Sequence, residues 1–154
     1  MSENINFNVA LNRAMALCAQ RELCIGDIRV KLESWGITDA DADKIIITLI
    51  AENFINEDRY ANAFVRDKYH YNKWGRVKIA SHLRAKKIGT EPIRSALASI
   101  DETQYKQMIK DTLTAHRKSI RAKNQCDLKG KLMRFGLSRG YESNLLYDIL
   151  NELE

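Results

Sequence analysis

The segment IASHLRAKKI (residues 79–88) has two counterparts in the same chain, IRVKLESWGI (residues 28–37) and LKGKLMRFGL (residues 128–137). In each, an apolar residue is followed four positions later by leucine, and the leucines Leu32, Leu83 and Leu132 are 51 and 49 residues apart. The correspondence continues downstream, where 45–49 matches 96–100 and then 145–149. Self-similarity at a fixed spacing is typical of repeat proteins, in which each repeat is one supersecondary unit.

Each repeat is predicted to contain three helices. In the middle repeat, apolar residues at spacings of three and four predict a helix over 57–71, with Asn56 as its N-cap. A second helix is expected from about Gly75. A third is expected from about Thr90, since Pro92 is tolerated in a first turn. The β-branched run 45–50 could form a buried strand, but its counterpart 96–100 favours a helix.

The predicted fold is therefore all-α, an elongated array of three tandem three-helix repeats over residues 1–56, 57–101 and 102–154. One proline and seven glycines in 154 residues agree with long helices. The first helix of the third repeat is expected over about 103–123. Two sets of end signals are predicted: Gly36 and Gly136 as helix C-caps, and Thr38, Thr90 and Ser138 as caps of the third helices.

Charge is distributed unevenly among the repeats. The net charge is −3 over residues 1–56, +5 over 57–101 and +3 over 102–154, which sums to the overall +5. This polarity favours a basic surface that faces a polyanion. The three cysteines Cys18, Cys24 and Cys126 do not have the spacing of a zinc site, no apolar run is long enough to span a membrane, and Met1–Asn4 is unlike a secretory signal. A cytoplasmic protein with reduced thiols is expected.

Nothing in the sequence favours catalysis. The histidines His70, His82 and His116 are scattered, and no nucleophile motif or glycine-rich phosphate loop is present. The acids Asp39, Asp41 and Asp43 lack the glycine and glutamate of a calcium loop, and they are interpreted as first-turn helix charges. We expect no enzymatic activity, no metal and no cofactor.

The candidate binding residues lie in the middle repeat, where residues 66–78 interleave cations with aromatic rings that could contact phosphates and stack on bases. Lys78, His82 and Lys86 recur every four residues and should form one stripe. Arg59, Arg66 and Lys73 recur every seven and form another if the first helix is continuous. The predicted set for DNA or partner binding is Arg59, Arg66, Lys68, Lys73, Trp74, Arg76, Lys78, His82, Lys86 and Lys87.

The cations and aromatic residues of this segment also have a structural interpretation. Tyr69 and Trp74 could be core residues instead of contact residues, and the cations could be a solvated face. Core packing is favoured for Tyr69, whereas Tyr71 is expected to be exposed. A second basic run, 116–123, is expected to be solvated.

The middle repeat resembles the RecX family, the regulators of the bacterial recombinase RecA. The residues that carry the resemblance are FINEDRYA (residues 54–61), Trp74-Gly75-Arg76, Ile79, Leu83 and Lys86-Lys87-Ile88. Two positions depart from the family pattern, because Lys87 replaces a glycine and His82 stands where an acid is common. Arg21-Glu22-Leu23 and Lys31-Leu32 are similar to the family's first unit.

The resemblance implies a monomeric protein that docks in the groove of the RecA–DNA filament and restrains recombinase activity in repair and recombination. Its partners would then be the RecA filament and single-stranded, and also double-stranded, DNA. Two other functions remain open from the residues alone: a DNA-binding helical module that acts without a recombinase, and a helical scaffold for an unrelated protein.

Overall fold

The computed structural model describes residues 5–153, which form nine α-helices and no strand. Residues 1–4, on which the expectation about a secretory signal rests, lie outside the described part. The helices are α1 (Phe7–Gln20), α2 (Ile25–Ser34), α3 (Asp39–Ala51), α4 (Glu57–His70), α5 (Arg76–Ala85), α6 (Thr90–Ala98), α7 (Glu102–Arg117), α8 (Gln125–Ser138) and α9 (Ser143–Glu152). Within residues 5–153, no helix is long and apolar enough to cross a bilayer.

Polar caps and buried stripes explain where the helices form. The side chains of Asn6, Thr38, Asn56, Asp101 and Asn124 each accept a hydrogen bond from a backbone N–H in the first turn of the following helix. Such a bond satisfies one of the amides that a helix start leaves unpaired. The ambiguous run 45–50 is helical, because α3 buries Ala42, Ile45, Ile46 and Leu49 along one side.

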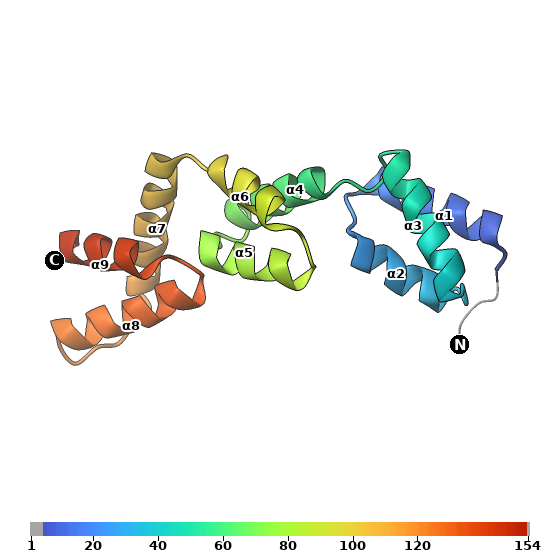
Figure 1. The fold of residues 1–154 in the computed structure, drawn as a ribbon. Helices are drawn as coiled ribbons and strands as arrows, with labels where there is room; N and C mark the ends of the chain where they lie inside the picture. Colours follow the sequence, from blue (N-terminus) through green and yellow to red (C-terminus); the bar gives the residue numbers. More distant parts are fainter. Residues whose placement is uncertain (1–4, 154) are drawn as a thin grey trace.

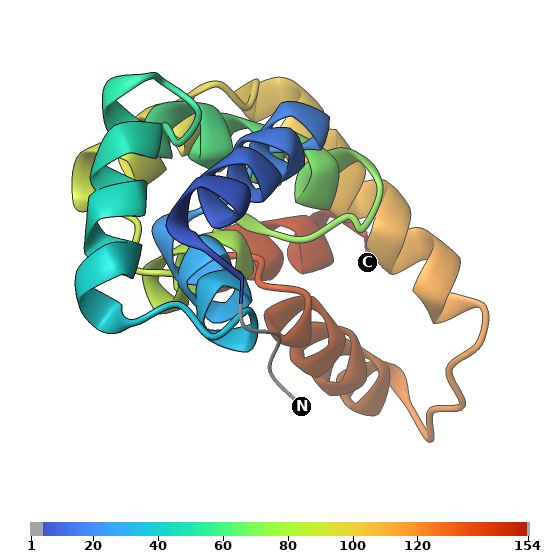
Figure 2. The same ribbon diagram turned by 90° about the vertical axis from the view of Figure 1, so that its right-hand side faces the viewer.

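The nine helices follow one another as three triplets in an elongated row (Figure 1). We call them the N-terminal unit (α1–α3), the middle unit (α4–α6) and the C-terminal unit (α7–α9). Seen along the length of the row, the three units lie one behind another and overlap in projection (Figure 2). The predicted all-α array of three-helix repeats is confirmed.

The buried side chains of residues 5–153 form two cores instead of three. One lies within α1–α3, and the other runs from α4 to α9 and also includes Cys24. The middle and C-terminal units therefore share a core, while the N-terminal unit has its own. The boundaries at residues 56 and 101 stay a prediction, because the shared core crosses the second of them.

The third repeat differs from the predicted correspondence by one helical turn. Gly36, Lys87 and Gly140 have positive φ angles of 78°, 63° and 91°, and each follows a second helix. The residue after each donates a backbone hydrogen bond to Leu32, Leu83 and Gly136, respectively. These ends are 51 and 53 residues apart, because α8 has 14 residues whereas α2 and α5 have 10.

Three predicted end signals in the sequence are wrong, and one helix is shorter than expected. Gly136 lies inside α8, where a Cβ would come within 2.4 Å of the Leu146 side chain. The glycine that ends α8 with a positive φ angle is instead Gly140. Ser138 is the last residue of α8, and Glu142 is the N-cap of α9. Thr90 is the first residue of α6, after the N-cap Gly89. The helix expected over 103–123 ends at Arg117.

Candidate nucleic-acid interface

The predicted binding residues come together most closely around Trp74, in the loop between α4 and α5. The Nζ atoms of Lys68 and Lys78 lie 4.8 and 4.4 Å from the centroid of the indole ring. The His82 ring centroid is 4.6 Å from that of Trp74, and Phe64 packs on it edge-on at 6.4 Å. We call Phe64, Lys68, Trp74, Lys78 and His82 the Trp74 cluster.

Local backbone structure holds this cluster in place. The last turn of α4 is followed by Lys73 in the left-handed region, at φ 57°, and the Trp74 amide then donates to the Lys68 carbonyl. The chain therefore folds back, so that Trp74 lies between the end of α4 and the start of α5. Trp74 is half-buried, so its ring packs against the core and is still partly accessible to solvent.

The two lysines of the cluster are not neutralised by carboxylates. Among residues 5–153, neither Lys68 nor Lys78 forms an ion pair, and each instead lies over the face of the Trp74 ring. An ammonium over an aromatic face is attracted by the ring quadrupole and still has donors for another acceptor. Two such ammonium groups beside one partly exposed ring suit a phosphate backbone with an adjacent base.

Three of the predicted binding cations are instead engaged between units. Arg59 pairs with Glu22 at 2.6 Å and donates to the carbonyls of residues 53 and 54. Arg76 pairs with Glu142 at 2.7 Å and with Glu102 at 2.8 Å. Lys86 pairs with Asp27 at 2.8 Å. We therefore assign Arg59 and Arg76 to holding neighbouring units together.

The remaining predicted residues are exposed and do not belong to the Trp74 cluster. Arg66 is 3.9 Å from Asp67, Lys73 donates to the His70 carbonyl, and Lys87 is solvated at a helix end. The stripe expected from residues seven apart does not form, because α4 ends at His70, before Lys73. Tyr69 belongs to the core and Tyr71 is 82% exposed, as expected.

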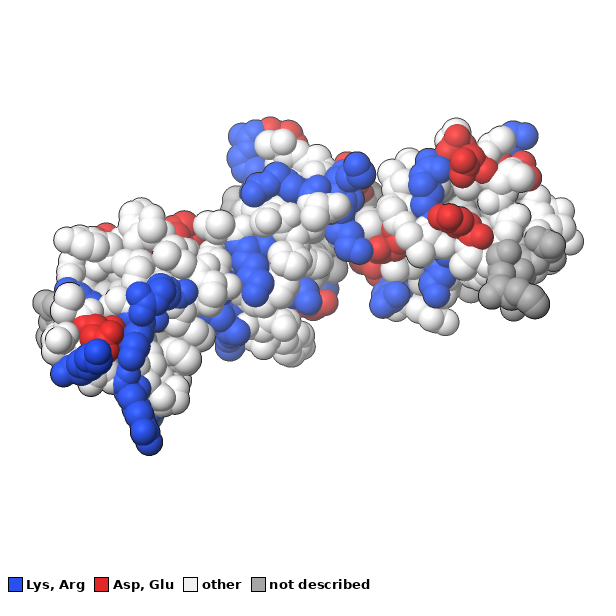
Figure 3. Space-filling view, turned by 90° about the horizontal axis from the view of Figure 1, so that it is seen from below, with Lys and Arg blue, Asp and Glu red and all other residues white. Residues whose placement is uncertain are grey.

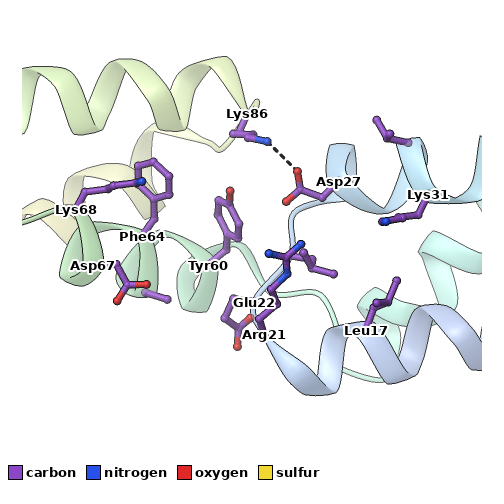
Figure 4. Close-up of a pocket in the computed structure, with 13 residues that line it drawn as sticks. Leu17, Arg21, Glu22, Asp27, Lys31, Tyr60, Phe64, Asp67, Lys68 and Lys86 are labelled. Atoms are coloured by element: carbon purple, nitrogen blue, oxygen red, sulfur yellow. Dashed lines mark hydrogen bonds and ion pairs between the residues drawn. The ribbon is translucent and has the colours of Figure 1, made fainter. Parts of the chain in front are cut away.

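A cleft beside the cluster was not predicted from the sequence. It has a volume of about 690 Å³ and lies between the N-terminal and middle units (Figure 4). Phe64 and Lys68 line it as well as belonging to the Trp74 cluster, so the two features are continuous. The opposite wall comes from α1, α2 and the loop between them, far away in sequence from α4 and Lys86 on the near side. Only the tertiary structure could reveal it.

Positive charge is concentrated away from the N-terminal unit. On the face drawn in Figure 3, Lys and Arg predominate over the middle and C-terminal units, while Lys, Arg, Asp and Glu are mixed on the N-terminal unit. This agrees with net charges of −3, +5 and +3 for the three repeats. Within residues 5–153, no three His, Cys, Asp or Glu side chains are placed to hold a metal ion. Asp43 of the α3 acidic run instead pairs with Arg29 at 2.7 Å.

The three linked helix triplets define a tandem three-helix-repeat protein. Residues 56–97 match the family description "RecX, second three-helix domain". The resemblance to the RecX family that the middle repeat indicated is confirmed.

Relatives named "Regulatory protein RecX" extend the match beyond the middle unit. That of Clostridium botulinum (strain Eklund 17B / Type B) is 32% identical over 128 residues, which cover 81% of this chain and 59% of the relative. That of Mycolicibacterium smegmatis is 24% identical, covering 92% of this chain and 78% of the relative. The chain thus spans about three fifths of the first relative's length.

Two solved structures share the fold. A chain described as "Crystal structure of regulatory protein RecX" superposes with a TM-score of 0.86 at 20% identity, covering 95% of this chain and 73% of the other. RecX from Lactobacillus salivarius gives a TM-score of 0.80 at 21% identity, with 96% of each chain covered. At these identities the likeness establishes the helical architecture alone.

Proposed function

We propose that this protein is a regulator that binds the RecA–DNA filament and restrains the recombinase. Similarity to relatives named regulatory proteins supports the regulatory role, and the family resemblance supplies the RecA filament as partner. The observation that carries the DNA contact is the Trp74 cluster, with two unpaired ammonium groups beside a half-exposed indole. An extended array of units can lie along a filament and bind one filament state better than another.

The proposal is tested by titrating the protein into RecA on single-stranded DNA and measuring ATP hydrolysis. Hydrolysis should fall at amounts of this protein well below those of RecA, since one bound regulator can affect neighbouring filament subunits. Trp74→Ala and Lys68→Ala should weaken the effect, whereas Lys44→Ala, an exposed lysine on α3, should leave it unchanged. Unchanged hydrolysis at saturating wild-type protein would contradict the proposal.

A second candidate is a DNA-binding module that needs no recombinase, and the same cluster supports it. If Lys68 and Lys78 each contact a phosphate of single-stranded DNA, each Lys→Ala change should lower the log–log salt slope by about 0.7. Lys44→Ala should leave the slope as it is. Tight binding to DNA in the absence of RecA, with no effect on RecA, would favour this candidate over the first.

A further inference from the structure

The two junctions between units are built from equivalent parts. In each, the start of the second helix in one unit meets the end of the second helix in the next. A tyrosine of the following first helix, Tyr60 or Tyr105, is buried at the same place. The equivalent start positions are Cys24 and Gly75, both N-caps, and the equivalent end positions are Lys87 and Gly140.

The junction between the middle and C-terminal units is closed by backbone contact. The Gly75 amide donates to the Arg139 carbonyl at 2.7 Å, and the Val77 amide donates to the Gly140 carbonyl at 3.0 Å. A Cβ on Gly75 would lie 2.2 Å from the Gly140 oxygen, and a Cβ on Gly140 would lie 2.2 Å from Lys78 Cβ. Only glycine at both positions permits this approach.

Side chains then fix the closed junction further. The Tyr105 hydroxyl accepts from the Arg76 amide and donates to Glu142, whose carboxylate also pairs with the Arg76 guanidinium. The Tyr141 hydroxyl donates to the Lys73 carbonyl at 2.6 Å. Together with the shared core, these bonds make α4–α9 one body.

The junction between the N-terminal and middle units lacks such contact. Among the described residues, no backbone hydrogen bond joins α1–α3 to α4–α6. Two ion pairs join the N-terminal and middle units instead, Asp27–Lys86 and Glu22–Arg59. Cys24 precedes α2 and belongs to the core that runs from α4 to α9. Clefts of about 690 and 520 Å³ flank this junction, and Asp27 and Lys86 line both of them.

The Asp27–Lys86 pair is partly exposed, to about the same degree as Glu22–Arg59, and it also lines both clefts. The side chains are 24% and 47% exposed, so the pair is open to competition from solvent ions. Lys86 also continues the α5 stripe of Lys78 and His82 toward the cleft, and it faces Asp27 across the junction (Figure 4). A phosphate that contacts Lys86 would compete with Asp27 for the same ammonium.

We infer that the N-terminal unit is hinged at residues 52–56 against a rigid α4–α9 body, and that Asp27–Lys86 is a latch which a bound polyanion releases. Residues 52–53 form a turn and residues 54–55 a bend, and Asn53 adopts φ 61°. That a bound polyanion releases the latch rests on the proposed function. The existence of the latch does not, because salt alone should weaken an exposed ion pair.

Double electron–electron resonance on the full chain tests the hinge without DNA. Spin labels on Lys44→Cys in α3 and on the exposed native Cys126 in α8 span the hinge, while Cys18 and Cys24 are buried, and mass spectrometry checks that two labels attach. Asp27→Asn should broaden and shift the distance distribution, and high salt should broaden that of the wild type. Asp43→Asn, which removes an ion pair inside the N-terminal unit, is the matched control and should change nothing.

A second label pair, Arg84→Cys with Cys126, lies within the α4–α9 body and should keep one narrow distance throughout. The hinge is refuted if Asp27→Asn and salt leave the 44–126 distribution as narrow as that of the wild type. Adding oligothymidylate to the wild type should reproduce the Asp27→Asn distribution, with binding followed separately by anisotropy. Binding without any change in distance refutes polyanion release, whereas no binding at all refutes DNA contact and leaves the hinge result standing.

Discussion

Replacing Gly75 by alanine should separate the closed junction. The φ angle of Gly75 is −81°, which alanine adopts without strain, so the effect comes from contact alone. The new Cβ would lie 2.2 Å from the Gly140 oxygen, whereas unstrained heavy-atom contacts are about 3.5 Å, so the turn must retreat by about 1 Å. That movement lengthens the Gly75–Arg139 hydrogen bond from 2.7 Å beyond bonding range.

The expected loss follows from these changes. Two backbone hydrogen bonds contribute about 0.5–1.5 kcal/mol each, and overpacking costs about 1–3 kcal/mol. Because the two effects overlap, we expect the free energy of unfolding to fall by about 3 kcal/mol. Urea denaturation followed by circular dichroism measures it, and the melting temperature should drop by roughly 6–12 °C, at about 2–4 °C for each kcal/mol.

The matched control is Gly26→Ala, at the second residue of α2, beside the junction between the N-terminal and middle units. A Cβ there meets only Cys24 Sγ, at 3.9 Å, and alanine in a helix should stabilise the protein by about 0.5–1 kcal/mol. The two Gly→Ala changes should therefore have opposite signs. If Gly75→Ala is as stable as the wild type, glycines are not what closes the junction between the middle and C-terminal units.

Three further changes should be measurable by denaturation. Lys87→Gly relieves a left-handed lysine at φ 63° and should raise stability by about 1 kcal/mol. Tyr105→Phe removes the hydroxyl that donates to Glu142 and accepts from the Arg76 amide, and it should lower stability by about 1–3 kcal/mol. Burial opposes ionisation of Asp27, but hydrogen bonds from Lys86 and Cys24 outweigh it and hold the pKa of the Asp27 carboxyl below its usual value. The contribution of Asp27 is therefore present at neutral pH and is lost below about pH 4, so Asp27→Asn should lose less stability than the wild type between pH 7 and pH 3.

The local signals in the sequence were sufficient for the helices of the middle unit. The N-cap Asn56, the first-turn Pro92 and apolar residues three and four apart act over a few residues, so their consequences do not depend on the rest of the chain. The site was only partly predictable. Lys68, Trp74, Lys78 and His82 do gather, because a helix end, a short loop and the next helix keep them near one another.

What the sequence determined by itself is a row of three helix triplets with a basic middle. Repeat spacing, caps and charge can be read directly along the chain, without knowing which distant residues meet. The tertiary structure decided the rest. A four-residue insertion in α8 is invisible to helical periodicity, because positions i and i+4 share a face. The engagement of Arg59, Arg76 and Lys86 depends on partners 37, 66 and 59 residues away, and only folding brings those carboxylates within reach.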